Sequence, residues 1–143
     1  MSVSVRAAAL VAALGLAPLA GLAEGLPPET EARIAEELGA TDYFDFVWLP
    51  SPKGDEALAV VFFPIPGAAG NFDSASGLFA VSGGKTTLEG QPILFGTEPR
   101  EARFLADRIE LVTTMPRPDD PRCCPTGSAH WVIDRQTMDV TKK

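Results

Sequence analysis

The 143-residue sequence is poor in the residues that build metal and redox sites, since it has two cysteines and one histidine. The cysteines, Cys123 and Cys124, are adjacent, so the C-x-x-C spacing of zinc sites and thiol–disulfide oxidoreductases is absent. The sequence also lacks the G-x-S-x-G elbow of hydrolases and the D-x-D-x-D-G pattern of calcium loops. No catalytic residue can therefore be named from the sequence.

Basic residues are also scarce, with 12 lysines and arginines against 19 acidic residues and a net charge of −7. An acidic protein of this kind is a poor ligand for nucleic acids and for anionic membrane surfaces. After residue 23 no segment is long and apolar enough to cross a bilayer. We therefore expect no nucleic-acid partner and no membrane insertion of the mature chain.

Residues 1–23 have the pattern of a secretory signal peptide. Arg6 supplies the positive charge, residues 7–16 are apolar, and Gly21 and Ala23 place small residues before a cleavage site. Cleavage there removes one basic residue, so 12 becomes 11 against 19 acidic residues, and the net charge becomes −8. The sequence predicts a periplasmic or secreted protein with one α+β domain over residues 24–143.

One helix is predicted, over residues 26–38. Pro27 and Pro28 suit a first helical turn, Glu29 and Glu31 complement the helix dipole, and Gly39 is a typical residue after a helix. The apolar residues of this segment fall on one side. We expect the helix to pack on a sheet.

The rest of the chain favours strands, separated by loops over residues 66–77 and 116–127. The apolar run over residues 57–63 predicts a strand buried on both faces. Residues 100–115 fit one helix or two strands, and their β-branched residues favour two strands, over 102–105 and 108–114. The remaining strands are expected over residues 43–49, 78–82, 85–88, 93–95, 129–133 and 138–141. The sequence therefore predicts an N-terminal helix packed on a mostly antiparallel sheet of about seven strands, with Phe44, Phe46, Trp48, Phe62 and Phe63 in its core.

The cysteine pair has three interpretations. Export into an oxidising compartment favours a disulfide between Cys123 and Cys124 that stiffens a loop, although adjacent Cα atoms lie closer than in most disulfides. Two free or partner-linked thiols are the second interpretation. The third is a copper or zinc site made by Cys123, Cys124 and His130, because thiolates and imidazole are ligands for these metals.

The run Asp120-Pro121-Arg122-Cys123-Cys124-Pro125-Thr126 resembles the signature of an uncharacterised family of small exported bacterial proteins, Asp-Pro-x-Cys-Cys-Pro-[Ser/Thr]. In those proteins the signature comes late in the chain and follows a β-strand. The resemblance covers about the last third of the sequence and implies a small secreted or periplasmic domain. It implies no activity and no functional residues.

Together these observations favour an exported, monomeric, non-catalytic binding or structural module, without a cofactor, whose partner is a protein or an envelope component. Two alternatives stay open. One is a periplasmic copper or zinc protein that uses Cys123, Cys124 and His130. The other is an enzyme with a site assembled from dispersed residues.

Overall fold

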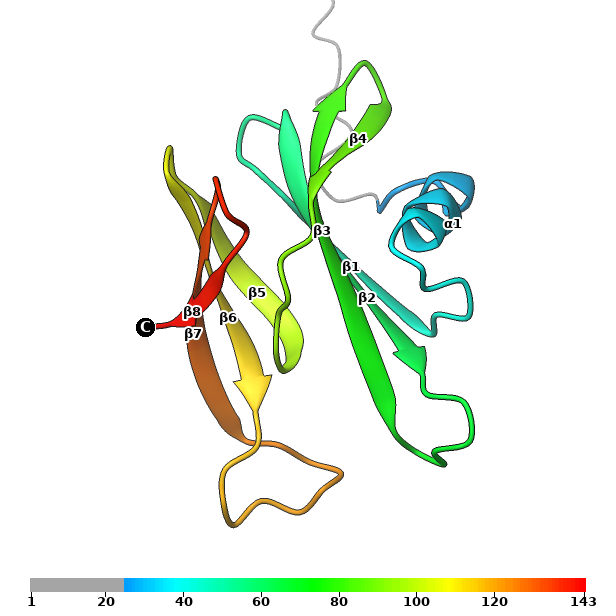
Figure 1. Cartoon of the computed structure of the whole chain (residues 1–143), viewed down its shortest axis with the longest axis vertical. Coiled ribbons are helices and arrows are strands. Elements are labelled where there is room, and N and C mark those ends of the chain that lie inside the picture. Colours follow the sequence, from blue (N-terminus) through cyan, green and yellow to red (C-terminus); the bar gives the residue numbers. More distant parts are fainter. Residues whose placement is uncertain (1–24) are drawn as a thin grey trace, which may run out of the picture.

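The protein is described by a computed structural model over residues 25–143, so the predicted signal peptide, residues 1–23, lies outside the described part. The described residues form one helix and eight strands (Figure 1). In chain order these are α1 (Pro28–Glu37), β1 (Asp45–Pro50), β2 (Glu56–Pro64), β3 (Phe72–Ser82), β4 (Lys85–Gly90), β5 (Thr97–Phe104), β6 (Arg108–Met115), β7 (Gly127–Asp134) and β8 (Val140–Lys142). No helix among them is long and apolar enough to cross a membrane.

The strands form two antiparallel four-stranded sheets, in the orders β1-β2-β3-β4 and β5-β6-β7-β8. We call them the first sheet and the second sheet. The prediction of one sheet with about seven strands is therefore wrong, although the mostly antiparallel α+β character is confirmed. Figure 1 shows three layers, with α1 against the first sheet and the second sheet on its other side.

Helix α1 forms where its prolines and acidic residues predict. Pro27 precedes the first turn, and Gly39 follows the last turn with a φ of +74°, a conformation that glycine adopts easily. Ile34, Ala35 and Leu38 are buried against the first sheet, in a cluster with Ala59, Val61 and Phe79. The predicted packing of the helix on a sheet is confirmed.

Strand β2 is buried on both faces, as its apolar run predicts. Leu58, Val60 and Phe62 point into the main core between the two sheets, whereas Ala59 and Val61 point toward the helix. The second sheet supplies the other half of the main core, which includes Ile109, Leu111, Ala129, Trp131 and Ile133. Strand β2 thus contributes to both cores.

The predicted strand over residues 93–95 is wrong, because this segment is the extended linker between the sheets. Two side chains hold it, since the Ser76 hydroxyl donates to the carbonyl of Pro92 and the Thr113 hydroxyl donates to the carbonyl of Phe95. Ile93 and Phe95 are left 72% and 53% exposed. The linker is thus hydrogen-bonded to side chains of both sheets. It separates β4, the last strand of the first sheet, from β5, the first strand of the second sheet.

Strand β3 begins at Phe72, so the second half of the loop predicted over residues 66–77 is strand. The small residues of β3 lie where neighbouring side chains leave little room. A Cβ atom at Gly77 would lie 2.8 Å from atoms of Leu38, Phe79 and Leu88. Glycine at this position lets helix α1 approach the sheet closely. The small residues that suggested a loop in this segment are therefore explained by close packing against the helix.

The two-strand interpretation of residues 100–115 is confirmed by β5 and β6. Strand β5 is irregular, with two shifts of register against β6. Glu98 and Glu101 lie at these shifts with φ values of +49° and +55°. Such positive φ angles are uncommon for residues with a side chain and mark two bulges in this strand.

The aromatic residues predicted for the core are buried to different degrees. Phe62 is buried in the main core, and Phe46, Trp48 and Phe63 pack in part against the helix cluster. Phe44 is 61% exposed, so its predicted core position is wrong. It lies before the first residue of β1 and contacts Phe72 at a ring-centroid distance of 5.7 Å.

Candidate functional site

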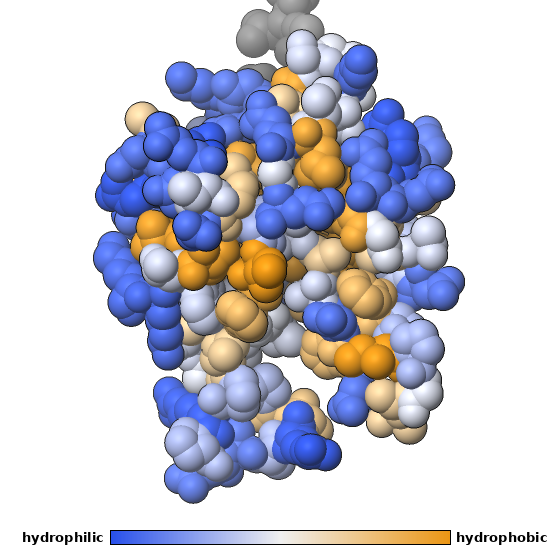
Figure 2. Space-filling view, viewed as in Figure 1, coloured by the Kyte–Doolittle hydropathy of each residue, from blue (hydrophilic) through white to orange (hydrophobic). Residues whose placement is uncertain are grey.

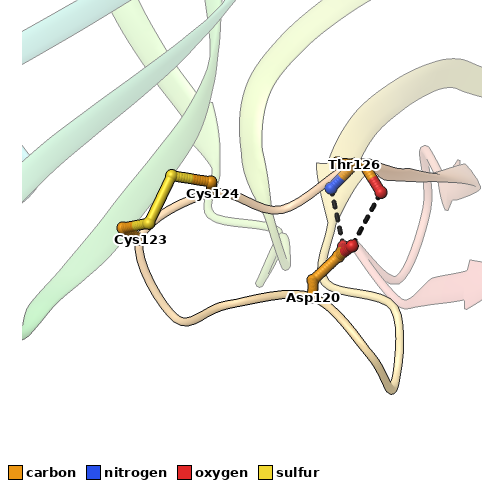
Figure 3. The surroundings of a disulfide bond; sticks show 4 residues. All are labelled: Asp120, Cys123, Cys124 and Thr126. Carbon is orange, nitrogen blue, oxygen red and sulfur yellow. Dashed lines mark hydrogen bonds between the residues drawn. A yellow bond between two sulfur atoms is a disulfide. The ribbon is translucent and has the colours of Figure 1, made fainter.

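The cysteine pair lies in the 116–126 loop, which joins β6 to β7 as the sequence predicts. Cys123 and Cys124 form a disulfide, with Cα atoms 3.8 Å apart, and both residues are exposed (Figure 3). The backbone N–H of Cys124 donates to the carbonyl of Pro121 at 3.0 Å. The disulfide and this turn restrict the same stretch of backbone.

A second restraint in this loop comes from Asp120. Its carboxylate accepts hydrogen bonds from the backbone N–H of Arg117 and from both the N–H and the hydroxyl of Thr126, each at 2.7 Å. The Arg117 bond, followed by those of Thr126, lowers the pKa of Asp120 below its ordinary value. We call this arrangement the Asp120 clamp, and it ties the two ends of the loop together without the disulfide.

A cleft of about 580 Å³ separates the 116–126 loop from the strands. It is lined by Phe72, Gly96, Glu98, Thr114 and residues 122–125. Figure 2 shows a notch at the lower end of the molecule, between the part that carries this loop and the part that carries the tip of the β2–β3 hairpin. Cavities that hold small ligands are typically about 300–1,000 Å³, so this cleft is large enough for one.

The polar wall of the cleft is ordered by three side chains. The Thr114 hydroxyl donates to the Glu98 carboxylate at 2.6 Å. Arg100 donates to the Thr114 hydroxyl and to the Glu98 carbonyl, each at 3.0 Å. These contacts hold Glu98 in its positive-φ conformation, and backbone strain of this kind is frequent at binding sites.

The apolar wall of the cleft continues onto the hairpin surface. Phe72 is 46% exposed and lies between Phe44 and Phe62, with ring-centroid distances of 5.7 and 6.0 Å. A second, shallower cavity beside it is lined by Phe44, Ile65, Phe72 and residues 67–71. Extended exposed apolar patches on soluble monomers mark interaction sites, whereas single exposed apolar residues do not.

No protein-family model matches this chain, and no curated protein and no solved structure is significantly similar to it. The cleft therefore has to be interpreted from its own chemistry. It offers a disulfide and an aromatic ring, which are apolar, and a carboxylate and a hydroxyl, which form hydrogen bonds. The hydroxyl and the carboxylate are hydrogen-bonded to each other, from Thr114 to Glu98 at 2.6 Å.

The structure does not bring the residues of the predicted metal site together. His130 lies on β7 with an exposed side chain and lines a different cavity, beside Lys143 on the outer face of the second sheet. Across residues 25–143 no three His, Cys, Asp or Glu side chains are grouped so that they could hold a metal ion. A copper or zinc site at Cys123 and Cys124 stays a prediction that requires the reduced thiols.

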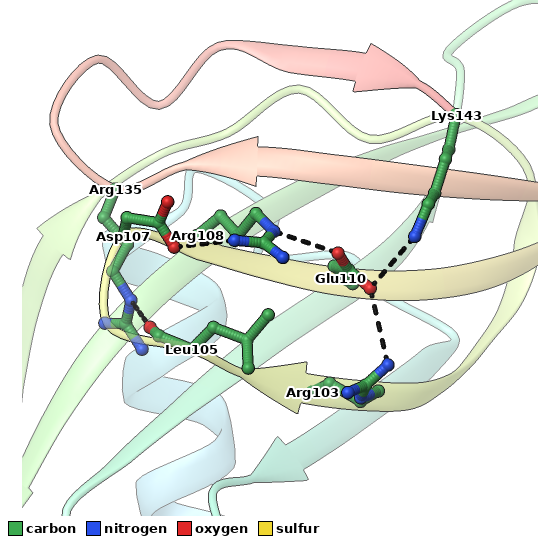
Figure 4. A network of polar contacts seen from close by, with 7 residues as sticks. All are labelled: Arg103, Leu105, Asp107, Arg108, Glu110, Arg135 and Lys143. Carbon is green, nitrogen blue, oxygen red and sulfur yellow. Dashed lines mark hydrogen bonds and ion pairs between the residues drawn. The ribbon is translucent and has the colours of Figure 1, made fainter.

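A separate cluster of charges covers the outer face of the second sheet (Figure 4). Glu110 accepts a hydrogen bond from Arg108 at 2.9 Å and lies 3.5 Å from Lys143 and 3.7 Å from Arg103. Arg108 above all, with Lys143, lowers the pKa of Glu110 below its ordinary value. The charges of this cluster are paired with one another, so we explain it as the solvent-exposed face of the second sheet.

Sequence reasoning found the cysteines but missed the rest of the cleft. Phe72 lies in a segment predicted as loop, and no sequence motif marks Glu98. The Asp120 clamp has a local signal, an aspartate six residues before a threonine across a proline-rich loop, because aspartate readily caps nearby backbone N–H groups.

Proposed function

We propose that this chain is an exported, non-catalytic binding module and that the cleft beside the 116–126 loop is its binding site. The observation that carries the proposal is the position of the disulfide, which lies in the wall of the cleft and continues an exposed apolar surface. A loop that is fixed before binding loses less conformational entropy when the ligand binds. The disulfide and the Asp120 clamp both fix this loop.

The ligand that fits this cleft best has an apolar ring and at least one hydrogen-bonding group. Phe72 and the disulfide supply polarisable apolar surface, and sulfur and aromatic groups pack favourably against rings. Glu98 and Thr114 supply the polar contacts that orient a ligand. Aromatic side chains of a partner protein and the sugar rings of an envelope polymer both meet this description.

A nuclear magnetic resonance screen with small aromatic and carbohydrate compounds tests the proposal. We expect the amide shifts caused by binding to gather at residues 96–98, 114 and 122–126. Phe72→Ser should weaken the best binder by roughly tenfold, since it removes most of one wall. Ile93→Ser is the matched control, because Ile93 is even more exposed but does not line the cleft.

Two results would contradict the proposal. One is a set of shifts that gathers elsewhere or that Ile93→Ser weakens as much as Phe72→Ser. The other is a screen without any binder in the cleft. Export is tested separately by sequencing the N-terminus of the protein recovered from the producing cells: it should begin near Glu24, and an intact N-terminus in the membrane fraction would contradict cleavage.

A further inference from the structure

The Cys123–Cys124 disulfide is open to solution chemistry. Both residues are exposed and belong to a loop, so a reactant can approach the sulfur atoms without displacing a core element. Disulfides in exposed positions exchange with thiols more readily than buried structural ones.

The loop does not depend on the disulfide alone for its shape. The Asp120 clamp joins Arg117 to Thr126 through three hydrogen bonds that do not involve the sulfur atoms. When the disulfide opens, the clamp keeps the ends of the loop fixed. Only the backbone of Cys123 and Cys124, which the disulfide closes into a small ring, gains freedom. The two thiols therefore remain adjacent and can close again.

The carboxylate of Asp120, three residues before the pair, is engaged by the clamp. Figure 3 shows the Asp120 carboxylate directed toward Thr126 and away from the sulfur atoms. Its negative charge is already shared among three donors. Arg122 and Glu98 both line the cleft with Cys123 and Cys124, so the positive charge of the arginine favours a thiolate there, whereas the negative charge of the glutamate, which accepts from Thr114, opposes it.

The chain has no other cysteine, so the pair cannot shuffle to an alternative partner. Each thiol also has the other beside it as a resolving thiol, at the high effective concentration that covalent neighbours provide. A mixed disulfide with an outside thiol can thus be resolved within this chain. Cys123 and Cys124 therefore gain or lose two electrons together, as a disulfide and a dithiol interconvert.

We propose that Cys123–Cys124 is a thiol–disulfide exchange site for an external dithiol, in addition to the binding function of the cleft. One thiolate of the dithiol attacks one sulfur of the pair, so a mixed disulfide forms, the Cys123–Cys124 bond breaks, and the other cysteine leaves as a thiolate that takes a proton from water. The second thiol of the partner loses its proton to water and attacks the partner's first sulfur, which is the one bonded to this chain in the mixed disulfide. The partner closes to a disulfide, the second cysteine leaves and is protonated, and two electrons and two protons have passed from the dithiol to the pair.

The test mixes the oxidised mature protein with a soluble protein dithiol of the C-x-x-C class, and follows the mass of this chain and its free thiols. We expect a gain of two hydrogens, reversed by the disulfide form of the same partner, with an unchanged circular dichroism spectrum. The folded chain should react within about tenfold of the rate of the urea-unfolded chain, since both sulfur atoms are exposed. In Cys123→Ser and Cys124→Ser, the remaining thiol should form a lasting mixed disulfide with a partner whose disulfide is activated.

Three results would overturn the proposal. The first is a folded chain that reacts more than about a hundredfold more slowly than the unfolded chain, which is the behaviour of a shielded structural disulfide. The second is loss of the folded spectrum on reduction. The third is failure of both single-cysteine variants to form the mixed disulfide. None of these depends on whether the cleft binds a ring compound, so the two proposals fail separately.

Discussion

The first sheet is covered on both faces, whereas the second sheet is covered on one. Strand β2 places Val60 in the main core and Val61 under helix α1, and both are buried. Strand β7 places Ile133 in the main core, but the outer face beside it carries His130 and ion pairs. The difference shows why β2 is a continuous apolar run while β7 alternates: the layers that cover a strand determine its sequence pattern.

The largest expected effect comes from neighbouring residues of β7. Ile133→Ala should lower the free energy of unfolding by about 2–5 kcal/mol, because it leaves a cavity between the sheets. Val132→Ala, on the half-covered outer face, should cost less than about 1 kcal/mol. Urea unfolding measures both, and equal losses would show that the outer face of the second sheet is also covered.

Two neighbouring residues of β2 should show similar losses of stability, unlike the two residues of β7. Val60→Ala and Val61→Ala should each cost about 1–3 kcal/mol, since each removes fully buried methyl groups from one of the two cores. The same unfolding experiment applies. A much smaller loss for Val61→Ala would mean that helix α1 covers the first sheet only loosely.

A loss of similar size, but of polar origin, is expected at the ion pair that joins the sheets. Arg135, in the turn after β7, donates to Glu56 of β2 through both terminal nitrogens, at 2.6 and 2.7 Å, and donates to the carbonyl of Leu105. Arg135→Met should cost about 1–3 kcal/mol, because a charged hydrogen-bond network at two largely buried side chains is lost. Arg108→Met is the control: its partners all lie within the second sheet, so a comparable loss there would remove the special role of the bridge between sheets.

The smallest effect concerns the exposed charge cluster and appears as pH dependence. Because the folded pKa of Glu110 is lowered, its contribution to stability is present above the unfolded value of about 4.3 and is lost as the pH falls through the folded pKa. Wild type should therefore exceed Glu110→Gln in stability at pH 7, and this difference should vanish in acid. Urea unfolding from pH 7 to pH 2 measures it, and added salt should shrink it; a difference that grows in acid would contradict the argument.

Local patterns predicted the elements of this fold better than their assembly. The helix, the buried strand β2 and the β5–β6 pair follow from periodicity, turn residues and β-branched side chains. The division into two sheets depends on the linker, whose hydrogen bonds go to Ser76 and Thr113, residues 16 and 18 positions away. Neither contact leaves a signal in the linker itself, so its short apolar run resembled a strand.

The candidate site divides in the same way. The cysteine pair was predictable because adjacency is a property of the sequence, and the exposed loop was predictable from its prolines. The cleft was not, because Phe72, Glu98 and Thr114 come from three strands that only the packing of two sheets brings together. His130 shows the opposite error, since it is near the cysteines in sequence but lies at another cavity.

The two bulges of β5 also affect how copies of this protein meet. β5 is a border strand of the second sheet, and a straight border strand invites another chain to add to it through backbone hydrogen bonds. The positive-φ residues Glu98 and Glu101 interrupt that row of donors and acceptors and place charged side chains along it. At the opposite border, β8 is only three residues long and is followed by Lys143. The irregular strand beside the cleft thus also disfavours edge-to-edge association of copies of this protein at this border of the second sheet.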